Sequence, residues 1–207
     1  SIESSKPQYL LASAETLVSL QRYDEADALI HDHLRSFEHH PSFRHLLGQI
    51  AQLRGDLAAA SRLYEEASIL QPDNTQLLEE LACAQFAAEE FSACLDTLQV
   101  LSARQYDFSA QLHLLNARCL VQTNRMLDAR PIYKQLCKDL PHDVILWEES
   151  GWLAWTLEDW RGLRHAGTQA SSLAPDSSSG WMLMGVADRA DGKLKSAEAH
   201  LVKAVSC

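Results

Sequence analysis

The sequence predicts an all-α protein, a solenoid of about six helix-turn-helix hairpins. Two observations lead to this fold class. A pattern of apolar, small and proline residues recurs about every 34 residues, and no stretch alternates apolar with polar residues as a β-strand would. Because no linker rich in Gly, Ser or Pro divides the chain, we expect residues 1–207 to form one continuous solenoid.

The clearest unit begins at Pro41. Leu47 and Gly48 occupy its seventh and eighth places, Tyr64 its twenty-fourth and Pro72 its thirty-second. One such match would be weak, but the pattern recurs in phase along nearly the whole chain. The predicted repeats are 7–40, 41–74, 75–108, 110–143, 144–177 and 178–207.

The eighth place of every repeat holds a small residue. We expect this place to lie where the two helices of a hairpin cross, because a large side chain there would push them apart. Large apolar residues at the fourth, seventh, seventeenth and twenty-fourth places would fill the space around the crossing. The small residues are Ala14, Gly48, Ala82, Ala117, Gly151 and Gly185.

Short polar or glycine-containing turns divide each repeat into two helices. We expect these turns at Gln21-Arg22, Arg54-Gly55-Asp56, Glu89-Glu90, Asn124-Arg125, Glu158-Asp159 and Asp191-Gly192-Lys193. Between repeats, Pro72-Asp73-Asn74, Pro141-His142-Asp143 and Pro175-Asp176-Ser177 should end one helix and provide N-caps for the next. Pro131 predicts a late start or a mild kink in the second helix of the fourth repeat.

These spacings resemble the tetratricopeptide repeat (TPR), with its W-x2-L-G-x2-Y, A-x3-F and P pattern. The resemblance implies a right-handed superhelix in which the first helices of successive hairpins line a concave groove. The chain departs from the pattern in places: Gly167 stands where an aromatic residue is usual, and Leu163 replaces an alanine. We therefore expect bulk to be redistributed between neighbouring repeats there.

Composition excludes several classes of function. The chain has 18 basic and 28 acidic residues, so its net charge of 18 − 28 = −10 opposes nucleic-acid binding. No apolar run is long enough to cross a membrane, so no membrane partner is expected. The five cysteines are odd in number and widely spaced, which argues against a disulfide framework and a zinc site. We expect most of the thiols to be buried, and a reducing, cytoplasmic location.

The sequence shows no catalytic or cofactor-binding motif, and we expect neither catalysis nor a cofactor. It has no G-x-S-x-G, H-E-x-x-H or G-x-G-x-x-G. Histidines cluster at positions 31, 33, 39, 40 and 45, but no pair has the i, i+4 spacing of a helical metal site. We expect these rings to be solvated at the surface, with no metal.

The TPR resemblance implies that a protein or peptide partner lies in the groove, on the second, fifth, ninth and twelfth places of each repeat. The residues that we expect to contact it are Phe86, Leu114, Arg118, Glu148, Trp152, Trp155, Met182 and Arg189. Some family members grip a chaperone's C-terminal carboxylate with Lys, Asn and Arg. This groove lacks that set, so we do not expect a chaperone-tail adaptor of that kind.

The fifth repeat is unusual for its four tryptophans. Trp147 and Trp160 occupy core places, whereas Trp152 and Trp155 lie three residues apart on the groove face. Each tryptophan can bury up to roughly 250 Å². The pair would anchor apolar side chains of a peptide, or alternatively would pack against neighbouring first helices.

Three functions stay open at this point. The leading hypothesis is a protein-binding scaffold or chaperone-like adaptor. The repeats could otherwise be the recognition domain of a larger enzyme, or stack end to end as a structural solenoid. The last helix, 195–207, keeps Leu201 and Val205 without a covering helix. We therefore expect either that the native chain continues or that this helix pairs two copies in a homodimer.

Overall fold

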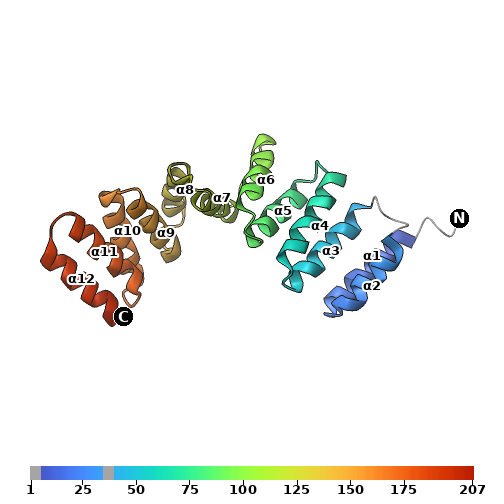
Figure 1. Cartoon of the computed structure of the whole chain (residues 1–207), viewed down its shortest axis with the longest axis horizontal. Coiled ribbons are helices and arrows are strands. Elements are labelled where there is room, and N and C mark those ends of the chain that lie inside the picture. Colours follow the sequence, from blue (N-terminus) through green and yellow to red (C-terminus); the bar gives the residue numbers. More distant parts are fainter. Residues whose placement is uncertain (1–5, 35–39) are drawn as a thin grey trace. The chain divides into compact units, whose positions relative to one another are not determined.

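The computed structural model describes residues 6–34 and 40–207. Within this part, the chain forms twelve α-helices and no β-strand, which confirms the predicted fold class (Figure 1). The first six helices are α1 (Lys6–Ser19), α2 (Tyr23–Leu34), α3 (Pro41–Leu53), α4 (Leu57–Leu70), α5 (Thr75–Ala87) and α6 (Phe91–Ala103). The others are α7 (Ala110–Gln122), α8 (Met126–Asp139), α9 (Val144–Thr156), α10 (Trp160–Leu173), α11 (Ser178–Ala190) and α12 (Leu194–Ser206).

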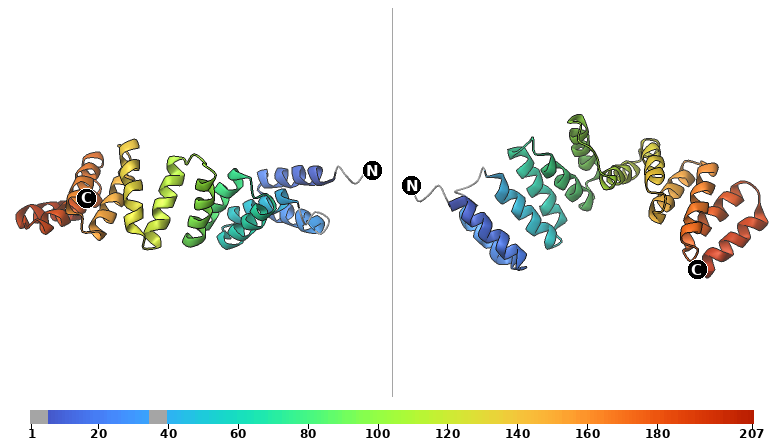
Figure 2. Two further views of the ribbon diagram at one scale, coloured as in Figure 1. Left: turned by 90° about the horizontal axis from the view of Figure 1, so that it is seen from above. Right: turned by 180° about the vertical axis from the view of Figure 1, so that it is seen from behind.

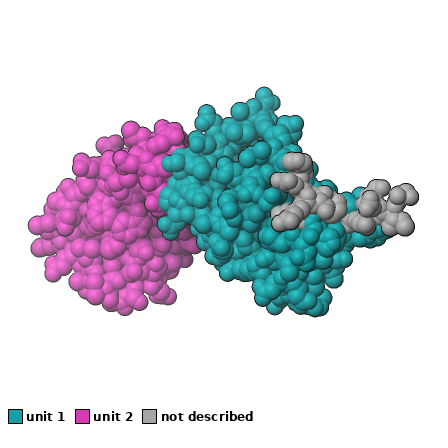
Figure 3. All heavy atoms as spheres, turned by 45° about the vertical axis from the view of Figure 1, so that its right-hand side comes forward, with its two compact units in different colours: residues 1–107 teal, residues 108–207 magenta. Residues whose placement is uncertain are grey.

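The helices form two compact units, Ser1–Asp107 and Phe108–Cys207, shown in two colours in Figure 3. Each unit contains three helical hairpins. Within a unit, each helix packs against the helices before and after it in the chain, and both views of Figure 2 show the two helices of each hairpin side by side. The continuous solenoid over residues 1–207 stays a prediction.

The six predicted hairpin turns all have the same geometry. Each contains one residue in the left-handed region, with φ between 54° and 82°. The residue after it donates its amide to a carbonyl five positions back, as Asp56 does to Ala51 at 2.9 Å and Lys193 to Asp188 at 2.9 Å. This pattern is a Schellman C-cap, which satisfies the last carbonyls of the first helix. The left-handed residues are Gln21, Gly55, Glu89, Asn124, Glu158 and Gly192.

The predicted N-caps between repeats are confirmed in two cases and wrong in the third. Asn74 accepts a hydrogen bond from the amide of Leu77, and Asp143 accepts from the amide of Leu146. Ser177 occupies the N-cap position of α11 but makes no capping bond, because its hydroxyl donates to Glu148 instead.

Pro131 lies inside α8, which begins at Met126. The prediction of a late helix start is therefore wrong. Pro131 is the sixth residue of α8, so the helix lacks the one internal hydrogen bond that an amide at this position would donate to the carbonyl of Leu127.

The eighth place of each repeat is buried, as predicted. A Cβ on Gly48 would lie 3.1 Å from the ring of Tyr64, and a Cβ on Gly151 would lie 2.5 Å from Leu183. Leu183 belongs to α11, the first helix of the following repeat. The small residue thus permits close approach both within a hairpin and between neighbouring hairpins.

Two glycines of the second unit bring the backbones of α10 and α11 together. A Cβ on Gly167 would lie 2.9 Å from the amide nitrogen of Met184. A Cβ on Gly180 would lie 2.4 Å from the amide nitrogen of Ser171 and 2.8 Å from its Cα. The absence of an aromatic residue at position 167 is thereby explained, since α11 occupies that space.

We predict that Gly180→Ala destabilises the second unit by about 1–3 kcal/mol, because backbone atoms cannot move aside as a side chain does. This loss should occur although alanine favours a helix over glycine by about 1 kcal/mol. Urea unfolding followed by circular dichroism measures it. Ser178→Ala, at an exposed place in the same turn, is the control; an equally stable Gly180→Ala protein would contradict the prediction.

Candidate functional site

In the second unit, the predicted groove face belongs to the first helices of the hairpins, α7, α9 and α11. Arg118 of α7 donates to Glu149 of α9 at 2.6 Å. Ser177, at the start of α11, donates to Glu148 of α9 at 3.1 Å. These contacts hold the three helices as neighbours, so that side chains of all three can form one binding surface.

The tryptophan pair lies on α9 with its rings in contact. The ring centroids of Trp152 and Trp155 are 5.2 Å apart, with an angle of 36° between the planes. Trp152 is half-buried and packs against the cluster of Ala154, Leu163, Leu183 and Ala187. Trp155 is 37% exposed. The two rings therefore differ: one contributes to packing, and the other presents aromatic surface to solvent.

The charged residues of the predicted site have partners within the unit. Arg118 makes an ion pair with Glu149, and this hydrogen bond raises the pKa of Arg118 further above its ordinary value. Tyr133 also donates to Glu149, at 2.9 Å, and burial together with this carboxylate raises the pKa of Tyr133. Both groups thus keep their protons at neutral pH. The Glu148 carboxylate accepts from Ser177.

The remaining predicted residues are not gathered around the tryptophan pair. Leu114 is half-buried and packs against the cluster of Leu136, Cys137 and Leu146. Met182 is 36% exposed on α11. Arg189 lines a shallow apolar cleft between α11 and α12. Phe86 belongs to the first unit, where its ring lies 5.7 Å from that of Phe91.

The histidines of the first unit have separate environments. His31 and His33 are exposed, and each Nδ1 lies within 3.0 Å of a carbonyl one turn earlier. His45 is only partly exposed, because it pairs with Glu80 of the next repeat. His39 lies outside the described residues. Within 6–34 and 40–207, no three metal-ligating side chains come together, and no helix could span a membrane.

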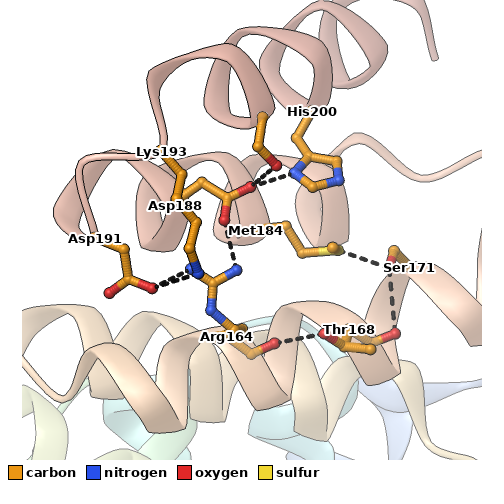
Figure 4. A network of polar contacts seen from close by, with 9 residues as sticks. Arg164, Thr168, Ser171, Met184, Asp188, Asp191, Lys193 and His200 are labelled. Carbon is orange, nitrogen blue, oxygen red and sulfur yellow. Dashed lines mark hydrogen bonds and ion pairs between the residues drawn. The ribbon is translucent and has the colours of Figure 1, made fainter.

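A buried carboxylate joins the last three helices (Figure 4). Asp188, on α11, is 1% exposed. It accepts hydrogen bonds from Arg164 of α10 at 2.6 Å, and from Ser196 and His200 of α12 at 2.5 and 2.8 Å. Arg164 also donates to Asp191, at 2.8 Å. Every member of this network is satisfied within the unit, so its role is to hold the helices together.

Burial by itself would raise the pKa of Asp188. The hydrogen bonds from Ser196, Arg164 and His200 together outweigh it and lower that pKa from 3.8 to about 2. The carboxylate therefore stays charged at all but the most acidic pH. The repeat pattern did not indicate this network or Asp188, because the places that define the pattern hold small, apolar or proline residues.

Sequence reasoning also missed a cleft on the other side of α9. It lies between α8 and α10 and has a volume of about 860 Å³. Trp147, expected in the core, lies at its edge, where its indole nitrogen donates to the carbonyl of Pro141 at 2.9 Å. The one available signal was the i, i+4 pair Lys134 and Lys138, which places two positive charges on one face of α8.

No protein-family model matches the sequence, and no curated protein is significantly similar to it. Solved structures do resemble the fold. MamA from Desulfovibrio magneticus RS-1 aligns with a TM-score of 0.70 and 17% identity, over 80% of this chain and 93% of MamA. YrrB, described as a TPR protein with an unusual peptide-binding site, aligns with a TM-score of 0.70 and 12% identity, over 86% and 91% of the two chains.

A third structure, the type IV pilus biogenesis factor PilW, aligns with a TM-score of 0.63 and 14% identity over 93% of this chain and 89% of PilW. Because the sequence identities are this low, the structural similarity establishes the fold and nothing about function. The chain has the tetratricopeptide-repeat fold, as its spacings predicted.

We predict that the second unit loses stability in acid through Asp188. Because the folded-state pKa is depressed, the contribution is complete above pH 3.8 and is lost as the pH falls toward about 2. The shift corresponds to about 2 kcal/mol. Asp188→Asn should therefore lower the free energy of unfolding at pH 7 by about that amount and flatten the acid limb of the stability profile.

Urea unfolding from pH 2 to 7 measures both effects. Asp191→Asn is the matched control, because Asp191 contacts the same arginine from an exposed position and should cause a clearly smaller loss. An Asp188→Asn protein with the wild-type profile would show that the network contributes nothing.

Proposed function

We propose that this protein is a non-catalytic interaction scaffold that binds a peptide or partner segment on the first-helix face of its second unit. The observation that carries the proposal is the ring of Trp155, which is 37% exposed and is held against Trp152. An indole with a large exposed surface has more to gain from a partner than any other side chain, and tryptophan is enriched at binding hot spots.

The surroundings of Trp155 support a binding role. The neighbouring ring of Trp152 is anchored in the buried cluster, so the orientation of the pair is already restricted before a ligand arrives. A preorganised surface loses less conformational entropy on binding. Away from the pair, Met182 of α11 is 36% exposed and offers flexible apolar surface to a longer partner.

Two charged residues of the predicted groove face already have partners within the protein, so they would orient a ligand more than attract it. Arg118 is neutralised by Glu149, and Glu148 is hydrogen-bonded to Ser177. The apolar contact would therefore supply most of the affinity, with these polar groups at its edge. The peptide-binding site named for YrrB, a protein of the same fold, supports the class of ligand but not the individual contacts.

A second candidate function, self-assembly through α12, is favoured by the apolar surface of this helix. Val205 is 89% exposed, and Leu194 and Val202 are also exposed. With Ala197 and Leu201 they line an apolar cleft of about 520 Å³. A second copy that presents the same helix would cover this surface symmetrically, as in a two-fold dimer.

We predict that Trp155→Ala weakens peptide binding at least tenfold and leaves the free energy of unfolding nearly unchanged, because the ring is exposed. Trp152→Ala should weaken binding and also destabilise the second unit, by about 2–4 kcal/mol, since it leaves a cavity beside the buried cluster. Peptides selected from a random phage-displayed library on the whole chain supply the ligand, and fluorescence anisotropy supplies the affinities.

Leu127→Ala is the control for this experiment, because Leu127 is an equally apolar exposed side chain on α8, a second helix of its hairpin. It should bind the selected peptides as the wild type does. The proposal fails if no peptide is enriched, or if Trp155→Ala binds the enriched peptides with wild-type affinity.

We predict that the double variant Val202→Glu, Val205→Glu stays at the chain mass of 23.1 kDa at every concentration, whereas the wild type rises toward twice that mass. Four carboxylates facing one another would oppose a two-fold contact. Light scattering measures the mass. Ile69→Glu, at an exposed site on α4, should dimerise normally; a monomeric wild type would exclude pairing.

A further inference from the structure

The cleft between α8 and α10 has a defined shape. Its floor is formed by Ser150, Leu153 and Ala154 of α9 and by Leu157, which directly follows this helix. Its long walls are formed by the second helices of two successive repeats, α8 on one side and α10 on the other. At about 860 Å³, its volume falls in the range of about 300–1,000 Å³ that is typical of ligand pockets.

Two pairs of side chains that line the cleft contact one another. In the first pair, the rings of Trp147 and His165 meet edge to face with centroids 5.2 Å apart, and Trp147 is fixed by its hydrogen bond to Pro141. In the second pair, Arg130 makes an ion pair with Asp159 at 2.5 Å. Asp159 also caps α10, accepting from the amide of Gly162 at 3.0 Å. The cleft is thus bounded by groups that the fold already holds in place.

The charge of the cleft is opposite to that of the protein. The chain carries a net charge of −10, yet the charged lining residues are Arg130, Lys134, Lys138 and Asp159. Arg130 and Asp159 neutralise one another. Lys134 and Lys138 are exposed, and within the described part of the chain neither makes an ion pair. Two uncompensated positive charges therefore lie one turn apart along the α8 wall.

The chemistry of the lining favours binding over reaction. The thiol of Cys137 borders the cleft, but burial raises its pKa to about 11, and its sulfur contacts the carbonyl of Leu146 at 3.6 Å. A protonated thiol is a poor nucleophile. The floor is otherwise apolar or carries the single hydroxyl of Ser150.

We propose that this cleft is a second binding site, which takes an acidic peptide segment bearing one apolar or aromatic side chain. The apolar side chain would rest on the α9 floor between Ser150 and Ala154. Carboxylates on either side of it would face Lys134 and Lys138. Charge complementarity selects this occupant, since a basic or neutral segment would leave both ammonium groups without partners.

This site is separate from the tryptophan surface. At about 100° per residue, Ser150 and Trp152 lie about 160° apart around α9. One helix therefore carries an aromatic anchor on one face and the floor of the cleft on the other. The two sites can be occupied together, and a variant of one leaves the other intact.

The test uses three fluorescein-labelled nine-residue peptides and the full chain. The first has a central Phe flanked by Asp and Glu, the second has the same Phe flanked by Lys, and the third has a central Gly flanked by Asp and Glu. Anisotropy at low salt should show that the first binds at least tenfold more tightly than the others. Raising the salt concentration should weaken it, because exposed charge pairs are screened.

Two variants locate the binding. Lys134→Glu with Lys138→Glu should reduce affinity for the first peptide at least tenfold, and Ser150→Phe should do so by filling the floor. Lys195→Glu with Lys203→Glu makes the same change in charge on α12 and should have no effect, nor should Trp155→Ala. Circular dichroism and urea unfolding of each variant verify that it is folded.

The proposal is overturned if the Lys-flanked or Gly-centred peptide binds as tightly as the first, or if the α12 charge variant loses as much affinity as the α8 variant. It is also overturned if the first peptide does not bind, or if the lysine pair is required for self-association in light scattering. In that last case the occupant would be a second copy. If Trp155→Ala is the only variant that loses binding, the first peptide binds the tryptophan surface and not the cleft.

Discussion

The close crossing of two helices in each hairpin is the constraint on which the rest of this structure depends. A small residue at the eighth place lets the first helix approach the second until the ring of Tyr64 lies against Gly48, and at Gly151 it also admits the side chain of Leu183 from the next hairpin. The approach then determines where each helix begins and ends, since only three residues lie between the two helices of every hairpin. Six Schellman caps follow, even where the left-handed residue is Gln or Glu.

Non-glycine residues in the left-handed region are strained. Four of the six turns contain one, and their geometry is nevertheless the same as at Gly55 and Gly192. The packing of two helices therefore overrides the local preference of a single residue. For the same reason α8 continues through Pro131, where contacts along the whole helix offset one missing hydrogen bond.

The second unit uses α9 on two faces. The tryptophan pair lies on one side of this helix and the cleft on the other. Beyond it, α10, α11 and α12 are held partly by charge, through Asp188 and Arg164. A buried carboxylate needs several donors to stay ionised, and Arg164, Ser196 and His200 supply them from two helices.

The sequence by itself determined the fold class, the positions of the hairpins and their turns, and the burial of the eighth place, because these depend on local periodicity that recurs six times. It placed Trp152 and Trp155 on one helix face for the same reason. Only the tertiary structure decided that Trp152 packs while Trp155 is exposed, that Arg118 and Glu148 have partners, and that Lys134, Lys138 and Trp147 border a cleft. Each of these features depends on the distances between helices. The spacing of residues along the sequence does not give those distances. Gly180 is the clearest example. Its close contact with Ser171 depends on how α10 packs against α11, and the repeat pattern does not predict it.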